Sequence, residues 1–174
     1  MARRLGITAA ATAGLAVSVW WAAGAFGPPS AAFAFAVCWL SMCWMGIAGK
    51  LFPPRLPEGW FRLRPCEHDG RVYRWAGVGL LKALVRRGPL HLFNRHLRMP
   101  AERTPEHLAR LEAGMREAEA AHAVLFVLVL PVVVHAVARG WWWAAWWTLA
   151  FDLVLNAWPV ALQRANRGRL LRLA

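Results

Sequence analysis

Four long apolar stretches alternate with polar stretches along the chain. They cover residues 5–26, 31–48, 120–138 and 141–162. Each has about the ~20 residues that a helix needs to cross a bilayer, so we expect four transmembrane helices. Residues 50–118 hold most of the charge, and we expect a cytosolic or interfacial insertion, basic and partly amphipathic, between helices 2 and 3. The pattern predicts an all-α membrane protein with a single integral domain, residues 1–174.

The links between the apolar stretches predict two helical hairpins. Gly27-Pro28-Pro29-Ser30 separates the first two stretches, and only Arg139 and Gly140 separate the last two. Proline stops a helix and glycine permits a tight turn, so both links suit antiparallel pairs. The first stretch follows Arg3 and Arg4 and also resembles a signal peptide. Its apolar core is longer than is usual for a signal, and we therefore favour a membrane helix.

The chain has few charged residues, and they are unevenly distributed along it. The chain is 59% hydrophobic and 17% charged, below the ~25% charge of a typical soluble domain. With four spans, 20 of the 21 Lys and Arg lie on one side and Arg139 alone lies on the other. Cytoplasmic loops of membrane proteins carry such an excess. We expect a multi-pass cell-membrane protein with both termini cytoplasmic, whose net charge of +12 faces membrane lipids and not nucleic acid.

The second predicted hairpin brings polar residues together at its open end. Pairing positions about its link puts Glu119 and His122 at the depth of residues 156–163. The polar residues on the opposite helix are Asn156, Gln163, Arg164, Asn166, Arg167 and Arg169. Polar groups at membrane depth are costly and usually face a bundle interior or a functional cavity. We take this convergence as the candidate site.

Glu119 and His122 lie three residues apart, on one helical face. A neutral imidazole can act as a general base, oriented by a carboxylate. Asn156 or Gln163 could then hold a hydroxyl substrate, while the arginines at 164, 167 and 169 neutralise phosphates or an oxyanion. A polar clamp that only locks two helices together is the alternative.

Metal and cofactor chemistry find little support in the sequence. Glu119-x-x-His122 is half of a di-iron site, which needs two copies, and one is present. His91, His96 and His107 lack the spacing and carboxylates of a metal site. The three cysteines form no Cys-x-x-Cys pair. We expect neither a metal ion nor a cofactor.

The polar insertion contains further features. Trp60 and Phe61 beside arginines suit an interfacial anchor, and residues 67–73 form either an ordinary loop or a second part of the site. Residues 72–85 could form a short amphipathic helix, weakened by two glycines. Thr104-Pro105-Glu106 predicts the start of a helix that continues into the third span.

The fourth span carries two unusual features. Asp152 is a lone acid near its middle, for which Asn156, four residues on, is a plausible partner. Five tryptophans crowd its outer end, at positions 141, 142, 143, 146 and 147. An aromatic belt at the membrane interface accounts for them, and a shelf that stacks a carbohydrate or polyene is the alternative.

Two motifs resemble a known family. Glu119-x-x-His122 opens a membrane helix, and Asn156-x-x-Pro159-x-x-x-Gln163-Arg164-x-Asn166-Arg167-x-Arg169 follows. Upstream stand Glu67-x-x-Gly70, Tyr73 and Lys82. Together they resemble the glycosyl-4,4'-diaponeurosporenoate acyltransferase family of small bacterial membrane proteins, over roughly residues 60–170.

The resemblance implies a membrane acyltransferase that moves a fatty acyl chain onto a hydroxyl of a lipid-soluble glycoside, as in the last step of carotenoid glycoside ester synthesis. The partners would be an acyl thioester donor, an amphipathic glycolipid or carotenoid glycoside acceptor, and membrane lipids. In this hypothesis His122 is the base and Glu119 its orienter, with Glu67 and Lys82 in support. The rival hypotheses are a non-catalytic scaffold for lipid or pigment enzymes and, faintly suggested by Asp152, a small transporter.

Overall fold

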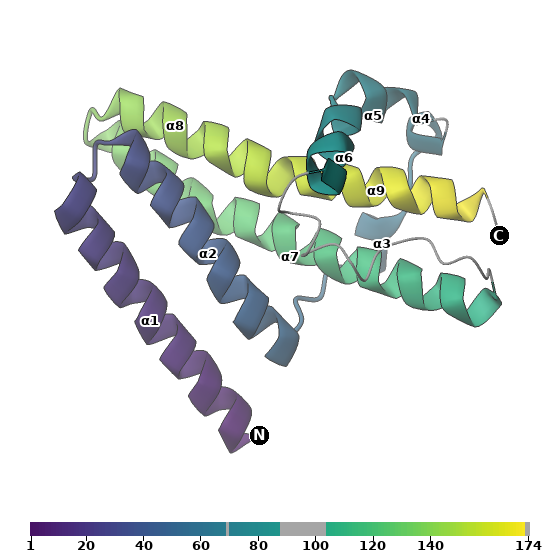
Figure 1. Ribbon diagram of the computed structural model, residues 1–174, viewed down its shortest axis with the longest axis horizontal. Coiled ribbons are helices and arrows are strands. Elements are labelled where there is room, and N and C mark those ends of the chain that lie inside the picture. The colour runs from purple at the N-terminus through teal and green to yellow at the C-terminus, as the bar shows by residue number, and fades with distance from the viewer. Residues whose placement is uncertain (69, 88–103, 173–174) are drawn as a thin grey trace. The chain divides into compact units, whose positions relative to one another are not determined.

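The computed structural model describes residues 1–68, 70–87 and 104–172. Within these ranges the chain is 85% helical and has no strand (Figure 1). Four helical stretches are long and apolar enough to cross a membrane, in agreement with the four long apolar helices predicted from the sequence. The chain divides into two compact units. The first unit consists of Met1–Pro54 and Ala121–Ala157, and the second of Arg55–Ala120 and Trp158–Ala174.

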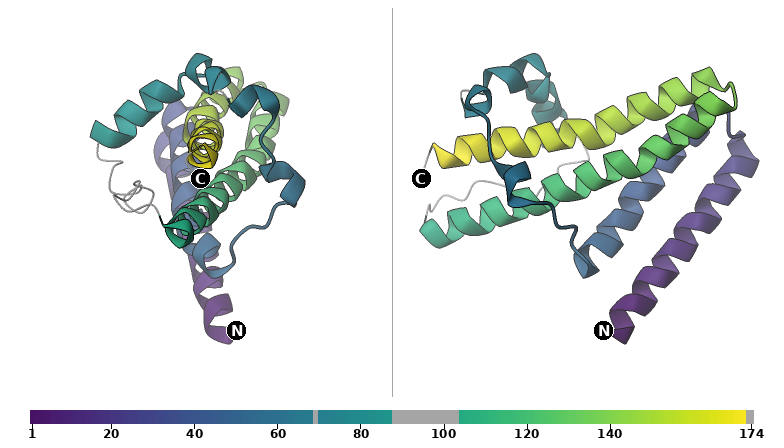
Figure 2. Two further views of the ribbon diagram at one scale, coloured as in Figure 1. Left: turned by 90° about the vertical axis from the view of Figure 1, so that its right-hand side faces the viewer. Right: turned by 180° about the vertical axis from the view of Figure 1, so that it is seen from behind.

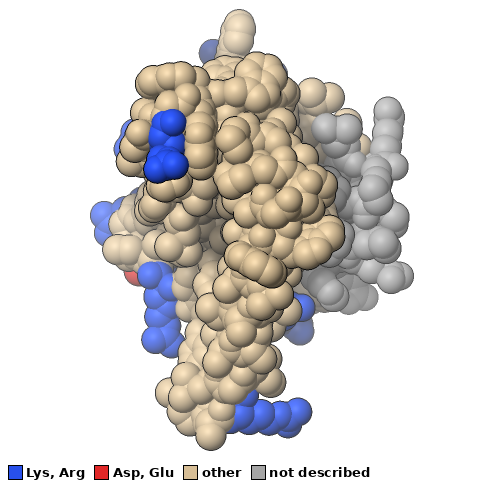
Figure 3. Space-filling view, turned by 90° about the vertical axis from the view of Figure 1, so that its left-hand side faces the viewer, with Lys and Arg blue, Asp and Glu red and all other residues tan. Residues whose placement is uncertain are grey.

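The first unit begins with the predicted hairpin of α1 (Ala2–Phe26) and α2 (Ala31–Leu51). Gly27 has a φ of 75°, and Ser30 caps α2 by accepting a hydrogen bond from the backbone N–H of Phe33. Most of α1 is exposed, including Trp20 and Trp21. Figure 3 shows a broad face almost free of charged side chains, with Lys and Arg near its margins. Such a surface suits a lipid environment.

The second hairpin joins α7 (Pro105–Ala138) to α8 (Trp142–Asp152). Gly140 turns the chain with a φ of 72°, and small residues, Ala136, Ala144 and Ala145, allow close packing beside the turn. The predicted third span is therefore the last part of a 34-residue helix. Its predicted start is also confirmed, because the Thr104 side chain accepts a hydrogen bond from the His107 N–H.

The fourth span is not a continuous α-helix. A π-helix, η3 (Leu153–Ala157), separates α8 from α9 (Trp158–Leu171). Pro159 lies two residues after this turn, and because proline has no N–H it cannot donate the regular α-helical bond to the Leu155 carbonyl. Proline alone does not require such a break, since Pro131 lies inside the continuous helix α7.

In the second unit, short helices pack around α9 (Figure 2). They are α3 (Glu58–Phe61), α4 (Pro65–His68), α5 (Arg71–Trp75) and α6 (Val78–Arg87). The amphipathic helix expected at residues 72–85 is thus two helices, since Gly77 adopts a φ of 70° between them. The Trp158 ring would lie 3.0 Å from a Cβ at Gly77. Tyr73, Val78, Leu81 and Leu162 form the apolar core of this unit.

Candidate functional site

The centre of the second unit is the guanidinium group of Arg164, on α9. Its Nε and Nη2 bind the two oxygens of Glu67 at 2.8 and 2.9 Å. Its Nη1 donates to Glu119 Oε1 at 2.9 Å and to the Trp60 carbonyl at 2.8 Å, and Nη2 also donates to the Arg62 carbonyl at 3.1 Å. An arginine has five N–H donors, and all five are used here.

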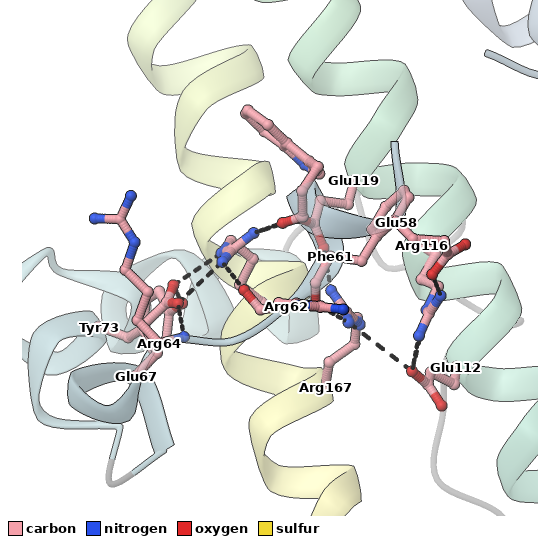
Figure 4. Close-up of polar contacts among 12 residues, drawn as sticks. Glu58, Phe61, Arg62, Arg64, Glu67, Tyr73, Glu112, Arg116, Glu119 and Arg167 are labelled. Atoms are coloured by element: carbon pink, nitrogen blue, oxygen red, sulfur yellow. Dashed lines mark hydrogen bonds and ion pairs between the residues drawn. The ribbon is translucent and has the colours of Figure 1, made fainter. Parts of the chain in front are cut away.

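Glu67 is equally committed (Figure 4). Besides the two bonds from Arg164, its carboxylate accepts the Tyr73 hydroxyl and the Arg64 backbone N–H, the latter at 2.6 Å. The bonds from Arg164 favour the charged form and lower the pKa of Glu67 to about 2, against the opposing effect of burial. Burial and the bond to Glu67 raise the pKa of Tyr73. Both groups therefore keep their charge state, Glu67 ionised and Tyr73 neutral, at physiological pH.

Glu119 joins Arg164 to Arg167. Its side chain is fully buried, with Oε1 on Arg164 and Oε2 at 2.8 Å from Arg167 Nη1. Arg167 is 2% exposed and also donates to the Phe61 carbonyl. The four side chains Glu67, Arg164, Glu119 and Arg167, which we call the ion network, alternate in sign and sum to zero charge. Buried charges are stable only when paired in this way.

A more exposed set of contacts borders the ion network. Arg116 pairs with Glu58 at 2.8 Å and with Glu112 at 3.0 Å. The Phe61 ring lies between two guanidinium groups, 5.3 Å from Arg116 Cζ and 5.5 Å from Arg167 Cζ. Trp60 and Phe61 were interpreted as an interfacial anchor. Trp60 is exposed, but Phe61 is buried, and the carbonyls of both residues bind arginines of α9.

A second polar cluster lies in the first unit, where α7 contacts η3. His122 Nδ1 is 3.2 Å from Asn156 Oδ1, and Asn156 Nδ2 donates to Asp152 Oδ1 at 2.7 Å. Asn156 and Asp152 are fully buried, while His122 is partly buried. These three residues, which we call the histidine triad, confirm the predicted pairing of Asp152 with Asn156. The hairpin register also placed His122 beside Asn156 correctly.

The other predicted residues occupy varied positions. Gln163 is buried, with no partner for its Oε1 among the described residues, and Asn166 is partly buried. Lys82 on α6 is partly buried and engaged in an interaction. Arg169 is exposed, and no ion pair to it occurs in the part of the chain that the structure describes. His91 and His96 lie outside the described residues.

Sequence reasoning missed the acceptors that hold the arginines. They are backbone carbonyls of Trp60, Phe61 and Arg62, and every residue has a carbonyl, so no sequence signal marks them. Glu67 had a signal, as an acid in a polar stretch flanked by arginines, but nothing indicated that its partner lies 97 residues away. Among the described residues, no group of three or more His, Cys, Asp or Glu could hold a metal ion.

The family model for glycosyl-4,4'-diaponeurosporenoate acyltransferase matches residues 57–174, more than half of the chain. The chain belongs to this family. The match contains the ion network and the histidine triad, and it leaves out α1 and α2. The glycosyl-4,4'-diaponeurosporenoate acyltransferase family is named for an acyl transfer reaction. Searches of curated proteins and of solved structures found no match.

Proposed function

We propose that this protein transfers a fatty acyl chain from an acyl thioester to a hydroxyl of a lipid-soluble glycoside, and specifically of a glycosylated carotenoid. The family supports the reaction class and the kind of acceptor. Four membrane-length apolar helices support a lipid-soluble substrate. The protein is then a multi-pass cell-membrane enzyme with both termini cytoplasmic, and residues 50–118 form its cytosolic face.

The contact between His122 and Asn156 carries the chemical part of this proposal. A sugar hydroxyl is a weak nucleophile until a base takes its proton. The His122 ring takes that proton while the hydroxyl oxygen forms a bond to the thioester carbonyl carbon. The tetrahedral intermediate then expels the thiolate, which receives the proton from the imidazolium. An ester and a free thiol result, and no oxidant or metal takes part.

Asn156, and not Glu119, orients the base in this proposal. The Asn156 amide lies against the His122 ring, whereas both oxygens of Glu119 are bound by arginines. The ion network accordingly has the supporting role. Lys82, Gln163 and Asn166 remain proposed contacts for the acceptor sugar. Arg169 is the proposed cation for an anionic donor, since the guanidinium groups of Arg164 and Arg167 are largely committed.

The test is acyl transfer by membranes that contain His122→Ala. We expect turnover to fall by about 10² to 10⁴, the usual contribution of a general base, at an unchanged protein level. His135→Ala is the matched control, because His135 lies on the same helix, is exposed, and packs its ring against Trp141, away from the triad. Equal turnover of His122→Ala and the control would remove His122 from the mechanism.

A non-catalytic scaffold is the second candidate, favoured by the number of bonds within the ion network. Both carboxylates and all five donors of Arg164 are bound, and among the described residues Arg167 Nε is the one buried atom of this network without a partner. Such a cluster is suited to holding a fold and not to binding a substrate. Lipid profiles of membranes with and without the protein separate the two functions. A new acylated glycoside supports the transferase, and an unchanged lipid profile, with altered recovery of other membrane enzymes, supports the scaffold.

A further inference from the structure

Asp152 is a buried acid to which the proposed reaction assigns no role. It lies at the end of α8, in the first unit, and is fully buried. Its Oδ1 accepts the hydrogen bond from Asn156 Nδ2, and its Oδ2 has no partner among the described residues. An unpaired buried carboxyl oxygen costs free energy. An apolar residue at this position would avoid that cost, so a purely structural reason for the acid is weak.

The contact with Asp152 determines which end of the Asn156 amide meets the histidine. An amide has one donor end and one acceptor end. The donor end is directed to Asp152, so the acceptor, Oδ1, faces His122 Nδ1 at 3.2 Å. Two acceptors cannot bond to each other, and Nδ1 must therefore carry the proton. A neutral imidazole has one N–H, which leaves the lone pair on Nε2.

We propose that Asp152 is a positioning residue that acts through Asn156 to hold His122 in the Nδ1–H tautomer, with Nε2 as the basic atom. The inference rests on the proposed function for its consequence in catalysis, but not for the tautomer itself. A carboxyl group is suited to this role because Oδ1 accepts the Asn156 N–H whether or not Oδ2 carries a proton. Asp152 allows only the orientation of the Asn156 amide in which Nδ2 faces it. That orientation allows only the Nδ1–H tautomer of the neutral His122 ring.

The backbone at this point agrees with a functional role. Asn156 lies within η3, the π-helical turn that directly follows Asp152. Such turns are rare and are frequent at functional sites. On α2, which packs against α8, Cys38 Sγ contacts the Thr148 carbonyl at 3.7 Å, one turn before Asp152.

The test compares the wild-type protein with Asp152→Asn. The amide introduced by this change is nearly isosteric and can either accept from Asn156 or donate to it, so both orientations of Asn156 become possible. ¹⁵N spectra of histidine-labelled full-length protein in lipid vesicles report the tautomer. The His122 signals are assigned by their loss in His122→Gln. Thr148→Val is the matched control, because it removes a buried hydroxyl one turn before Asp152 on α8.

We expect the Nδ1–H form in the wild type and in Thr148→Val, and a mixture of both tautomers in Asp152→Asn. In the acyl-transfer assay, Asp152→Asn should lower kcat at least about tenfold, as wrong tautomers do in other histidine bases, with KM unchanged. A wild-type ring protonated at Nε2 overturns the inference even if the variant fails to fold, and so does an unchanged tautomer in a folded variant. Activity that survives His122→Ala contradicts the proposed function and leaves the tautomer result intact.

Discussion

The two polar clusters of this protein differ in how fully their hydrogen-bonding capacity is used. In the ion network of the second unit, all five donors of Arg164 and both oxygens of Glu67 and Glu119 have partners. In the histidine triad of the first unit, one oxygen of Asp152 has no partner in the described part of the chain. The His122 ring contacts Asn156 through Nδ1 and also has a hydrogen bond with the backbone of Leu155.

This difference separates a cluster that maintains a fold from one that can react. A group that already makes every bond it can make gains nothing from a substrate, and breaking its bonds is costly. A base must keep a lone pair available. Charge alone would indicate the ion network as the reactive cluster. Its one buried atom without a partner among the described residues is Arg167 Nε, a donor that cannot accept a proton. The triad contains an imidazole, which can.

The strongest test of this comparison is Arg164→Gln. The change leaves Glu67 and Glu119 short of a buried partner, and breaking a buried pair in this way costs about 3–5 kcal/mol. We expect a large loss of thermal stability in detergent. Arg169→Gln, on the exposed face of the same helix, is the control. A stable variant that has lost only its affinity for the acyl donor would show that Arg164 binds substrate.

Glu67→Gln should produce the next largest effect, and its size should depend on pH. The pKa of Glu67 is lowered from 4.5 to about 2, a difference that corresponds to roughly 3 kcal/mol of stability at neutral pH. Because the folded pKa lies below the unfolded one, the unfolded chain binds more protons between pH 4.5 and about 2. The contribution is therefore complete above this window and is lost as pH falls through it.

Thermal unfolding of the wild type and Glu67→Gln, measured from pH 7 downward, checks this sign. The stability difference should be constant at neutral pH and should narrow as pH falls below about 4.5. Glu117→Gln, an exposed acid on α7, is the control. A difference that widens in acid would mean that the Arg164 contact does not hold Glu67 ionised.

Arg169→Ala should have the smallest effect on stability, within about 0.5 kcal/mol, because the residue is exposed. If Arg169 recognises an anionic donor, KM for that donor should rise while kcat stays constant. Steady-state acyl transfer at varied donor concentration measures this. A normal KM would leave donor recognition to other cations of the chain.

Hairpin geometry explains how much of the site could be predicted. A two-residue link fixes the register of antiparallel helices, so it placed Glu119 and His122 at the depth of residues 156–163. In the structure His122 lies beside Asn156, while Glu119 binds Arg164 and Arg167, which come just after this range. The chemical roles of these residues were harder to predict, because the sequence does not show which polar atoms lack a hydrogen-bond partner. Arg164 and Arg167 donate to backbone carbonyls of residues 60–62, and no side-chain pattern marks a carbonyl as an acceptor.

Periodicity also failed at two backbone positions. The pattern of apolar residues around Pro159 is the same whether the segment forms a continuous α-helix or contains a π-helical turn. At Gly77 the sequence predicted one weakened helix and not two helices, since glycine is tolerated inside helices at a cost of ~1 kcal/mol. At Gly77 the positive φ of a single residue outweighed the pattern around it.

The wide spacing of the ion network affects how the chain can be made. Glu67 meets its guanidinium partner 97 residues later, so during synthesis α4, which carries Glu67, leaves the ribosome well before α9 exists. Until then its carboxylate must stay hydrated. The second unit can therefore mature only after α9 has been synthesised, which makes translation order part of its assembly.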